Sequence, residues 1–479
     1  MLGNDTNTNK ERKQTMLQSM NYLFEQINDF VWGLPLIVLI LSVGIYLTLR
    51  LKGLQLLQLP RAFKYMFQKE EGGGEVSSFA ALCTALSATI GTGNIVGVAT
   101  AIVAGGPGAL FWMWVAAFFG MATKYAEGLL AIKYRVIDET GHVLGGPFYY
   151  IQNGMGNRWK WLAKLFAFFG VGVGLLGIGT FTQVNGISNA VNDFFDPTNK
   201  YTIAILGNNY SITVILAGII LTICVALVLI GGIKRISNVS QVIVPFMAGT
   251  YILTCLIILA TNASRIPEAF QTIFESAFGL RAATGGALGA MILSMQKGIA
   301  RGIFSNEAGL GSAPIAAAAA KTKEPVRQGL ISMTGTFIDT LIICTMTGLA
   351  IVITGTWDMG LDGVAVTTKA FQLGLPFPET FSAFLLMLCL VFFAFTTILG
   401  WNYYSERCLE YLIGNKKKAI LTFRLLYILA VFVGPFMTVS VVWTIADIFN
   451  ALMALPNLIA ILYLSKVIFG ETRGFFRRL

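Results

Sequence analysis

The sequence predicts an all-α polytopic membrane protein with eleven transmembrane helices, and three observations lead to that prediction. The 479 residues are 55% hydrophobic and only 12% charged, whereas a soluble protein carries about a quarter charged residues. Apolar runs of about 20 residues, the length that crosses a bilayer, recur along the whole chain. The 51 glycines are typical of membrane helices that pack closely.

Eleven apolar runs follow one another. They lie at about 30–50, 79–104, 108–132, 162–190, 211–231, 240–262, 284–320, 330–354, 381–406, 421–443 and 446–468. The first lacks a small-residue cleavage site, so we expect it to be retained. The run 284–320 is too long for one straight crossing and contains the polar stretch 304–309, which predicts two half-helices around a break.

The basic residues predict the orientation of these spans. Most of the 34 Lys and Arg residues fall in alternate loops, and the opposite loops hold only Lys200, Arg265, Arg281 and Lys369. Because basic loops face the cytoplasm, we expect an outside N-terminus and a cytoplasmic C-terminus in the plasma (inner) membrane. An odd number of spans requires the same arrangement. The net charge of +10 then faces anionic lipid rather than nucleic acid.

The two interrupted runs, 79–104 and 284–320, each begin a group of five, and the two groups start on opposite sides of the membrane. This predicts a 5+5 inverted repeat with one extra N-terminal helix. The predicted divisions are an extracellular tail, the extra helix with its cytoplasmic loop, the first repeat, the second repeat with its preceding external loop, and a cytoplasmic tail. These cover residues 1–29, 30–78, 79–262, 263–468 and 469–479.

The first interruption is the stretch 87–97, which contains Gly91, Thr92, Gly93 and Asn94. Lipid offers no partner to freed backbone groups, so a break here predicts bound ions or solutes. The amides of Thr92 and Gly93 with Asn94 suit a carboxylate at a half-helix N-terminus. The backbone carbonyls near the start of the stretch 87–97 suit a hard cation. The alternative is that small residues only permit close helix packing.

Segment 381–406 contains Thr396, Thr397 and Trp401. Two hydroxyls beside freed carbonyls would form a neutral oxygen shell, which favours Na⁺ over a proton. The alternative is that both threonines bond back to their own helix. Trp401 lies four residues after Thr397 and on the same face of the helix. Its indole could limit the pocket to a small substrate side chain.

Segment 162–190 contains Gln183 behind a run of glycines, which implies very close helix contact. A buried glutamine needs a partner, which is either the substrate or a neighbouring helix.

Charged residues within the spans are few, and burying each of them in the bilayer costs free energy unless it forms an ion pair or contacts water. Lys124 with Glu127, and Arg301 with Glu307, are predicted as internal ion pairs or gates; Lys297 and Asp339 complete the set. Arg301 is the alternative to the backbone amides as the anchor of a substrate carboxylate.

The only histidine, His142, lies in a loop where we expect it to be solvated. The six cysteines have no metal-ligand spacing and are expected to be small buried hydrophobes. Since no nucleophile or metal constellation is present near an interface, the sequence does not indicate an enzyme.

The stretch 105–120 (GGPGALFWMWVAAFFG), with 87–97, 302–312 and 396–401, resembles the alanine/glycine:cation (sodium:alanine) symporter family of the amino acid–polyamine–organocation superfamily. The likeness covers about residues 30–470. It implies a leucine-transporter-type fold and, with no other cofactor, Na⁺ as the coupling ion. It also implies substrate contacts from Thr92, Gly93, Asn94, Gln183, Asn306 and Trp401, and a sodium site from Ser87, Ile90, Thr396 and Thr397.

The expected function is therefore Na⁺-coupled symport of small neutral amino acids, namely alanine and, as a second substrate, glycine, by alternating access. Two alternatives remain at this point. A proton-coupled amino acid transporter would use Asp339 or Glu307 as the carrier. An ion channel would also use broken helices, although usually by symmetry between subunits rather than by a repeat within one chain.

Overall fold

The computed structural model describes residues 22–479 except 69, 140, 206–207, 281–285 and 438–439. Within these residues nine helices are long and apolar enough to cross a membrane, and ten spans result if the bent pair Ser78–Thr89 and Gly93–Gly105 counts as one. These ten correspond to ten of the eleven predicted runs. The remaining run, 284–320, contains Gln296, Lys297 and Arg301, which lower its hydropathy. The first predicted division, 1–29, lies mostly outside the described residues.

The N-terminal half of the chain forms the following elements. They are α2 (Leu34–Arg50), α3 (Leu54–Leu57), α4 (Leu59–Phe67), α5 (Ser78–Thr89), the π-helix η1 (Gly93–Gly97), α6 (Val98–Gly105), α7 (Ala109–Lys133), α8 (Pro147–Tyr149), the π-helix η2 (Tyr150–Gly154), the 3-10 turn η3 (Asn157–Trp159), α9 (Lys160–Leu176), α10 (Phe181–Phe195), α11 (Ile212–Leu229) and α12 (Gly232–Thr261).

The C-terminal half continues the helical bundle. Its elements are η4 (Ala263–Arg265), α13 (Ile266–Ala277), α14 (Ala287–Asn306), α15 (Ala313–Ala317), α16 (Pro325–Thr336), the π-helix η5 (Phe337–Cys344), α17 (Thr345–Thr354), η6 (Thr356–Asp358), α18 (Val364–Gly374), α19 (Glu379–Ile413), α20 (Lys417–Val433), η7 (Gly434–Phe436), α21 (Ser440–Tyr463) and α22 (Ser465–Arg477).

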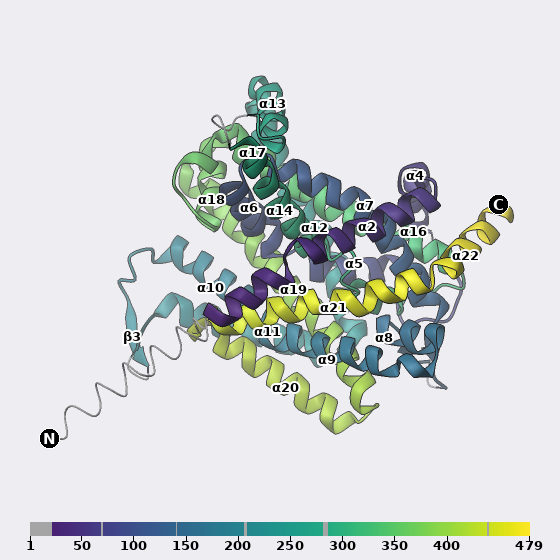
Figure 1. Ribbon diagram of the computed structural model, residues 1–479. Coiled ribbons are helices and arrows are strands. Elements are labelled where there is room, and N and C mark those ends of the chain that lie inside the picture. Colours follow the sequence, from purple (N-terminus) through teal and green to yellow (C-terminus); the bar gives the residue numbers. More distant parts are fainter. Residues whose placement is uncertain (1–21, 69, 140, 206–207, 281–285, 438–439) are drawn as a thin grey trace.

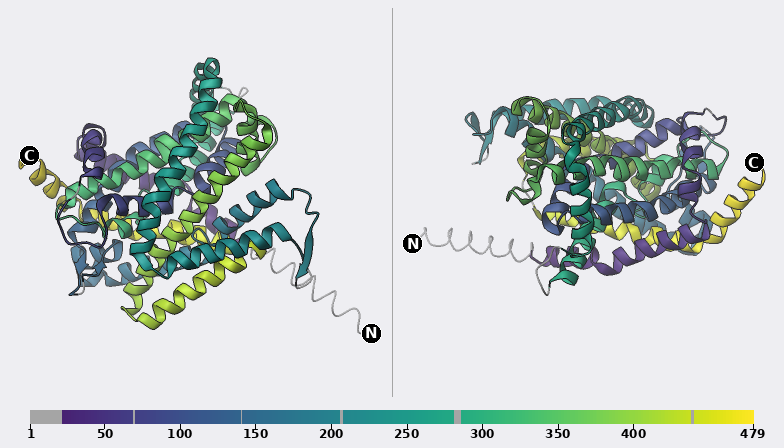
Figure 2. Two further views of the ribbon diagram at one scale, coloured as in Figure 1. Left: turned by 180° about the vertical axis from the view of Figure 1, so that it is seen from behind. Right: turned by 90° about the horizontal axis from the view of Figure 1, so that it is seen from above.

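Two short antiparallel hairpins join helices. Strands β1 (Val136–Ile137) and β2 (Val143–Leu144) pair with Val136 opposite Leu144, and β3 (Thr202–Ile205) and β4 (Asn208–Ser211) pair with Thr202 opposite Ser211. The long helices run between two ends of the molecule: α4, α8 and α22 lie at one end and β3 and α18 at the other (Figures 1 and 2). We call the end with α4, α8 and α22 the basic end, because the loops there carry most of the basic residues.

Both predicted helix breaks are present. The first separates α5 from η1 and α6, which are bent by 55° relative to α5. The second lies between α14 and α15, where Glu307, Gly309 and Gly311 have positive φ angles of 56°, 90° and 82°. Left-handed backbone at three positions ends the helical hydrogen bonding, so the chain cannot continue as one straight helix.

A third break lies where the sequence predicted one continuous span, 162–190. The helix stops at Leu176 and restarts at Phe181. Gly177 at the break has φ −154° and ψ −95°, which is not helical. The predicted close contact of this glycine-rich segment is present, since a Cβ on Gly170 would lie 2.5 Å from Cys408 Sγ and one on Gly177 would lie 2.0 Å from Ala446 Cβ.

Helix α19 packs on α5 through Gly400. A Cβ at this position would lie 2.7 Å from the backbone nitrogen of Ala88 and 2.8 Å from its Cα. Backbone atoms of a packed helix cannot move aside cheaply, so only glycine allows this approach. The contact fixes the distance between α19 and the helix that leads into the first break.

We expect Gly400→Ala to lower the thermal unfolding temperature of the detergent-solubilised protein, because the added methyl group forces α19 away from α5. Overpacking of this kind typically costs about 1–3 kcal/mol. The matched control is Gly249→Ala on α12, where an added Cβ meets nothing within 4 Å. Equal unfolding temperatures for the two variants would contradict the proposed packing constraint.

Candidate functional site

The first break begins after Thr89 and redirects one backbone amide. Ile90 still donates to the Leu86 carbonyl at 2.8 Å, as in a continuous helix. The next amide, that of Gly91, donates to the side-chain Oδ1 of Asn94 at 2.9 Å. A continuous helix would direct it to the Ser87 carbonyl. The Asn94 side chain therefore substitutes for helical bonding at this point.

The Ile90 carbonyl at the break faces Thr397 of α19. Thr397 Oγ1 donates to it at 3.3 Å and also to the Phe393 carbonyl at 3.0 Å. A Cβ on Gly91 would lie 2.5 Å from the same hydroxyl, so only glycine admits Thr397 this close. Carbonyl and hydroxyl oxygens of two helices, 307 positions apart, thus meet within the bundle.

The other two residues predicted for the sodium site are buried but lie further from this contact. Thr396 Oγ1 donates to the Phe393 carbonyl at 3.0 Å and lies 3.5 Å from Met247 Sδ of α12. Ser87 Oγ donates to the Thr84 carbonyl at 2.8 Å. The bonding of both threonines to their own helix, which was the alternative expectation, therefore coexists with the contact of Thr397 to the break.

The predicted substrate residues of the first break meet Gln183 of α10. The Thr92 amide points to Gln183 Oε1 at 3.4 Å, and Gln183 is 2% exposed. The same Oε1 would lie 3.4 Å from a Cβ on Gly91. Gln183 thus provides an acceptor opposite the amides that were predicted to hold a carboxylate.

The second break lies against the first. A Cβ on Gly93 would lie 3.6 Å from the Phe304 ring and 3.8 Å from the Cα of Ser305. Asn306, at the end of α14, donates through Nδ2 to Thr340 Oγ1 at 3.0 Å and accepts from the Ala308 amide at 2.9 Å. The two breaks, predicted separately, are therefore neighbours.

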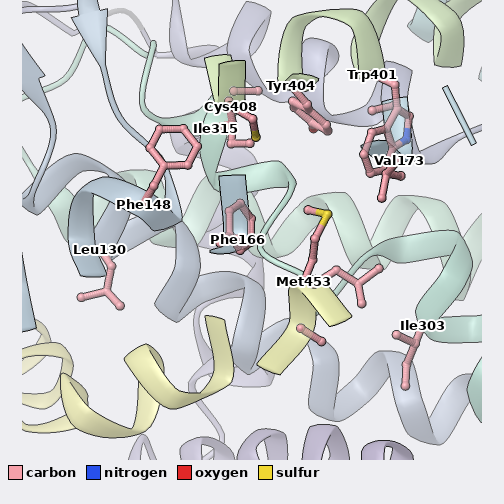
Figure 3. Close-up of a cluster of buried hydrophobic side chains, with 14 of the residues drawn as sticks. Leu130, Phe148, Phe166, Val173, Ile303, Ile315, Trp401, Tyr404, Cys408 and Met453 are labelled. Atoms are coloured by element: carbon pink, nitrogen blue, oxygen red, sulfur yellow. The ribbon is translucent and has the colours of Figure 1, made fainter. Parts of the chain in front are cut away.

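Trp401 lies one turn beyond Thr397 and faces the third break. It is 1% exposed, and a Cβ on Gly179 would lie 2.5 Å from Trp401 Cβ. Its ring contacts Tyr404 edge to face at 5.6 Å, in the apolar cluster that also holds Val173 (Figure 3). Within the described residues the indole Nε1 has no hydrogen-bond partner. A buried unpaired donor is costly, so this group is suited to a partner that is not part of the chain.

One of the two predicted charged pairs, Arg301 with Glu307, has other partners in the structure. Glu307 accepts a hydrogen bond from Ser312, and Arg301 instead lies 5.6 Å from the Phe304 ring centroid. Arg301 lines a cavity of about 190 Å³ with Lys297 and Asp447. Arg301 and Glu307 therefore do not form the predicted ion pair. The reason is that Glu307, in the left-handed region, turns away from the axis of α14.

Glu127 anchors the second break. Its Oε1 accepts from Asn457 Nδ2 at 2.6 Å and from the Gly309 amide at 3.1 Å. Asn457 Nδ2 also donates to the Gly309 carbonyl at 2.9 Å. Lys124, the predicted partner of Glu127, lines a second cavity together with Glu127. The carboxylate thus satisfies backbone groups that the left-handed turn exposes.

At the basic end the flanks of the two breaks are tied together. Val76 forms an isolated parallel β-bridge with Ala320, and the Lys321 amide donates to the Val76 carbonyl at 2.7 Å. Arg135 donates to the carbonyls of Ala318 and Ala320, both at 2.6 Å. The segment that leads into α5 and the segment that leaves α15 are therefore held by the same cluster.

His142 is not solvated as expected; it bridges two carboxylates at the basic end. Its Nδ1 lies 2.9 Å from Glu75 Oε1 and its Nε2 lies 2.9 Å from Glu410 Oε1. The hydrogen bonds that the ring donates to Glu410 and Glu75 raise the pKa of His142 to about 9, against the opposing effects of burial and of Arg407, whose Nη1 is 2.5 Å from Nε2. Burial alone would raise the pKa of Glu75, but the bond to His142 and the charge of Arg407 hold it below its ordinary value. The protonated ring therefore joins the segment before α5 to the end of α19.

Sequence reasoning did not assign three features of this site. The π-helix η5 places Asp339 beside Asn94, with Asn94 Nδ2 donating to Asp339 Oδ1 at 2.7 Å. The third break lies beside Trp401, and Glu127 holds the second break. The available signals were the intramembrane acids and the dense glycines of 170–179, but their partners lie in distant segments of the chain.

Comparison with known proteins gives consistent matches along the whole chain. A sequence profile of the sodium:alanine symporter family matches residues 17–479. The sodium/alanine symporter AgcS of Methanococcus maripaludis is 48% identical over 462 residues, which cover 95% of this chain and 96% of that protein. An uncharacterized transporter of Haemophilus influenzae is 55% identical over 460 residues, covering 95% and 96%.

Among solved structures, MhsT in complex with L-phenylalanine is similar in fold. The TM-score is 0.56 at 13% identity, and the match covers 81% of this chain and 89% of that one. At such low identity the likeness shows the fold alone.

We expect the His142 bridge to make the stability of the protein depend on pH. The folded-state pKa of about 9 exceeds the ordinary value of 6.5. The stabilisation is therefore complete below about pH 6.5 and is lost as the pH rises through about 9. A pKa shift of this size corresponds to about 3 kcal/mol for a fully buried group, and solvent screening of the partly exposed ring makes its contribution smaller. When the pH is raised from 7 to 10 in detergent, the unfolding temperature of the wild type should fall further than that of His142→Gln.

The control for this measurement is Lys133→Gln, which removes an exposed pair with Glu471 at the same end and should keep the wild-type pH dependence. An equal fall in unfolding temperature for the wild type and His142→Gln would show that the imidazolium does not stabilise the fold.

Proposed function

Because the chain belongs to the sodium:alanine symporter family, we propose that it carries alanine, and glycine as a second small substrate, together with Na⁺ by alternating access. Membership of the family makes the chain a multi-pass membrane transporter of amino acids with Na⁺ as coupling ion, not an enzyme. The choice of substrate, the residues that bind it and the orientation in the membrane are parts of the proposal.

The contact between the Ile90 carbonyl and the Thr397 hydroxyl is the observation that supports the cation site most directly. Both groups are buried and neutral, and they belong to helices that pack on one another. Neutral oxygens suit Na⁺ better than a proton. We place the ion between Ile90, Thr397, the Ser87 carbonyl and the Thr396 hydroxyl, which requires Thr396 to rotate away from Met247.

The substrate carboxylate is proposed to bind the amides of Thr92 and Gly93 with Asn94, at the N-terminal end of η1 and α6. The positive end of the half-helix favours an anion, and the carboxylate would take the Thr92 amide from its long, 3.4 Å bond to Gln183 Oε1. Gln183, Asn306 and Trp401 complete the pocket. Phe304 lies close to Gly93 and Trp401 lies close to Gly179; these bulky side chains would restrict the substrate to a small side chain, as in alanine or glycine.

We propose that the two broken helices move together, as one rigid body, relative to α19. The bridge between Val76 and Ala320 and the Arg135 cluster support this, because they join the flanks of both breaks. We assign the arrangement to a leucine-transporter-type 5+5 inverted repeat with an extra N-terminal helix. The basic end then faces the cytoplasm, and the N-terminus lies outside.

The coupling is energetically sufficient. One Na⁺ entering down about 100 mV gains about 2.3 kcal/mol, and a tenfold Na⁺ gradient adds about 1.4 kcal/mol. Together these can sustain a substrate gradient of several hundredfold.

Uptake of alanine into proteoliposomes should require Na⁺. Replacing Na⁺ by choline at constant pH should abolish accumulation against an alanine gradient. Accumulation that follows the pH gradient and ignores Na⁺ would instead favour proton coupling, and uptake that never runs uphill would favour a channel.

Thr397→Ala should raise the Na⁺ concentration for half-maximal uptake by about tenfold or more, because it removes one oxygen from the cation shell. Thr397→Ser keeps the hydroxyl and is the matched control, with a near-wild-type value. If Na⁺ dependence is the same in Thr397→Ala and in the wild type, the cation site is wrongly placed.

Arg301→Ala should leave the alanine concentration for half-maximal uptake unchanged within about twofold, because the amides rather than the guanidinium are proposed to hold the carboxylate. Arg301→Lys provides the charge-retaining control. A large loss of alanine affinity in the alanine variant alone would assign the carboxylate to Arg301.

A further inference from the structure

We infer that Asp339 is a positioning residue whose carboxylate fixes both helix breaks at once, so that the Na⁺ half-site and the amino-acid half-site form or fail together. The inference rests on the proposed function, since it concerns the two half-sites named there. It assigns Asp339 a role other than carrying a proton or contacting the substrate.

The position of Asp339 follows from the π-helix η5. This wide turn, Phe337–Cys344, joins α16 to α17 and lies against both breaks. Isolated π-turns within α-helices are often found at functional sites. Asp339 and Thr340, consecutive in sequence, are both 0% exposed and bond to one another, with Thr340 Oγ1 donating to Asp339 Oδ2 at 2.7 Å.

One carboxylate oxygen orients the first break. Asp339 Oδ1 accepts from Asn94 Nδ2 at 2.7 Å, and the Asp339 carbonyl also lies 3.3 Å from that nitrogen. Because the amide nitrogen is held there, Asn94 Oδ1 is turned to the Gly91 amide, from which it accepts at 2.9 Å. That bond diverts Gly91 from the Ser87 carbonyl. The orientation of one side chain thereby removes the Gly91 amide as helical partner of the Ser87 carbonyl, which under the proposed function contributes to the cation site.

The other carboxylate oxygen orients the second break. Ser305 Oγ donates to Asp339 Oδ2 at 2.9 Å. Thr340, which donates to the same oxygen, accepts from Asn306 Nδ2 at 3.0 Å. Asn306 then caps the break by accepting from the Ala308 amide at 2.9 Å. The last two residues of α14 are therefore placed by the same carboxylate.

A carboxylate suits this position because it only accepts hydrogen bonds. Three donors converge on it from three elements, namely Asn94, Ser305 and Thr340. Bonds to an ionised acceptor are shorter and stronger than neutral ones. A neutral asparagine could still accept from Asn94 through its oxygen, and its amide could donate to hydroxyls that rotate. An alanine could do neither.

The test measures the Na⁺ and alanine concentrations for half-maximal uptake in proteoliposomes containing equal amounts of folded protein. Asp339→Ala should raise both by about tenfold or more, as expected for the loss of a hydrogen bond to a charged group. Asp339→Asn should raise both by a smaller factor. The structural control is Thr367→Val, which removes an equally buried hydroxyl from the neighbouring Ile95 carbonyl and should change neither.

A double-mutant cycle with Asn94→Ala shows whether Asp339 acts through Asn94. If it does, the Na⁺ concentration for half-maximal uptake in the double variant should match that of Asn94→Ala within about twofold. Multiplicative effects of the two substitutions would overturn the inference, as would an Asp339→Ala effect on only one of the two ligands.

Two further results keep the inference distinct from its alternatives. If Asp339→Ala does not fold, Asp339→Asn carries the test: a joint rise in both concentrations supports the inference, and wild-type values overturn it. Loss of the wild-type pH dependence of uptake in Asp339→Asn would assign proton carriage to this residue and overturn the positioning role. Wild-type protein without Na⁺-dependent alanine uptake refutes the proposed function itself, whereas active wild type with unaffected Asp339 variants refutes only the inference.

Discussion

The interior of a membrane offers no partner to a free backbone amide or carbonyl, and the centre of this structure is organised by that constraint. Each interruption of a helix leaves polar groups that side chains must satisfy. Asn94 receives the Gly91 amide, and Asn306 receives the Ala308 amide. Glu127 accepts from the Gly309 amide, and Asn457 donates to the Gly309 carbonyl. The intramembrane polar residues are therefore mostly the counterparts of backbone groups, which explains why so few of them form simple ion pairs.

Hydropathy predicted most of the fold because a membrane span is a local property. Ten of the apolar runs correspond to spans in the described residues, and the breaks at 87–97 and 304–309 were predictable because glycine and polar residues interrupt apolar sequence there. The break after Leu176 was not, because glycines that permit close packing and glycines that end a helix look alike in sequence. Here Gly170 serves the first purpose and Gly177 adopts a non-helical conformation as well.

The partners in the site could not be predicted, because they join segments hundreds of residues apart. Asp339 bonds Asn94, 245 positions away, and His142 contacts Glu410, 268 positions away. A charge in a sequence indicates that a partner is needed, but the tertiary packing decides which one. Arg301 and Glu307 illustrate this: they are close in sequence, yet the left-handed turn at Glu307 directs its carboxylate to Ser312 and leaves Arg301 in a separate cavity near Asp447.

The two breaks are connected twice, by Asp339 at their centre and by the Val76–Ala320 bridge at the basic end. Helix α19 is attached differently: Thr397 touches the first break through one hydroxyl, and Glu410 reaches the segment before α5 through His142. Under the proposed function, the first of these contacts is one that Na⁺ replaces, because the ion takes the Ile90 and Thr397 oxygens that otherwise bond to each other. A cation could thus change how α19 is held to the broken helices at little cost in hydrogen bonding. The doubly connected pair would move without internal rearrangement, so the backbone groups of the two breaks would stay together, while Thr396, Thr397 and Trp401 would stay with α19.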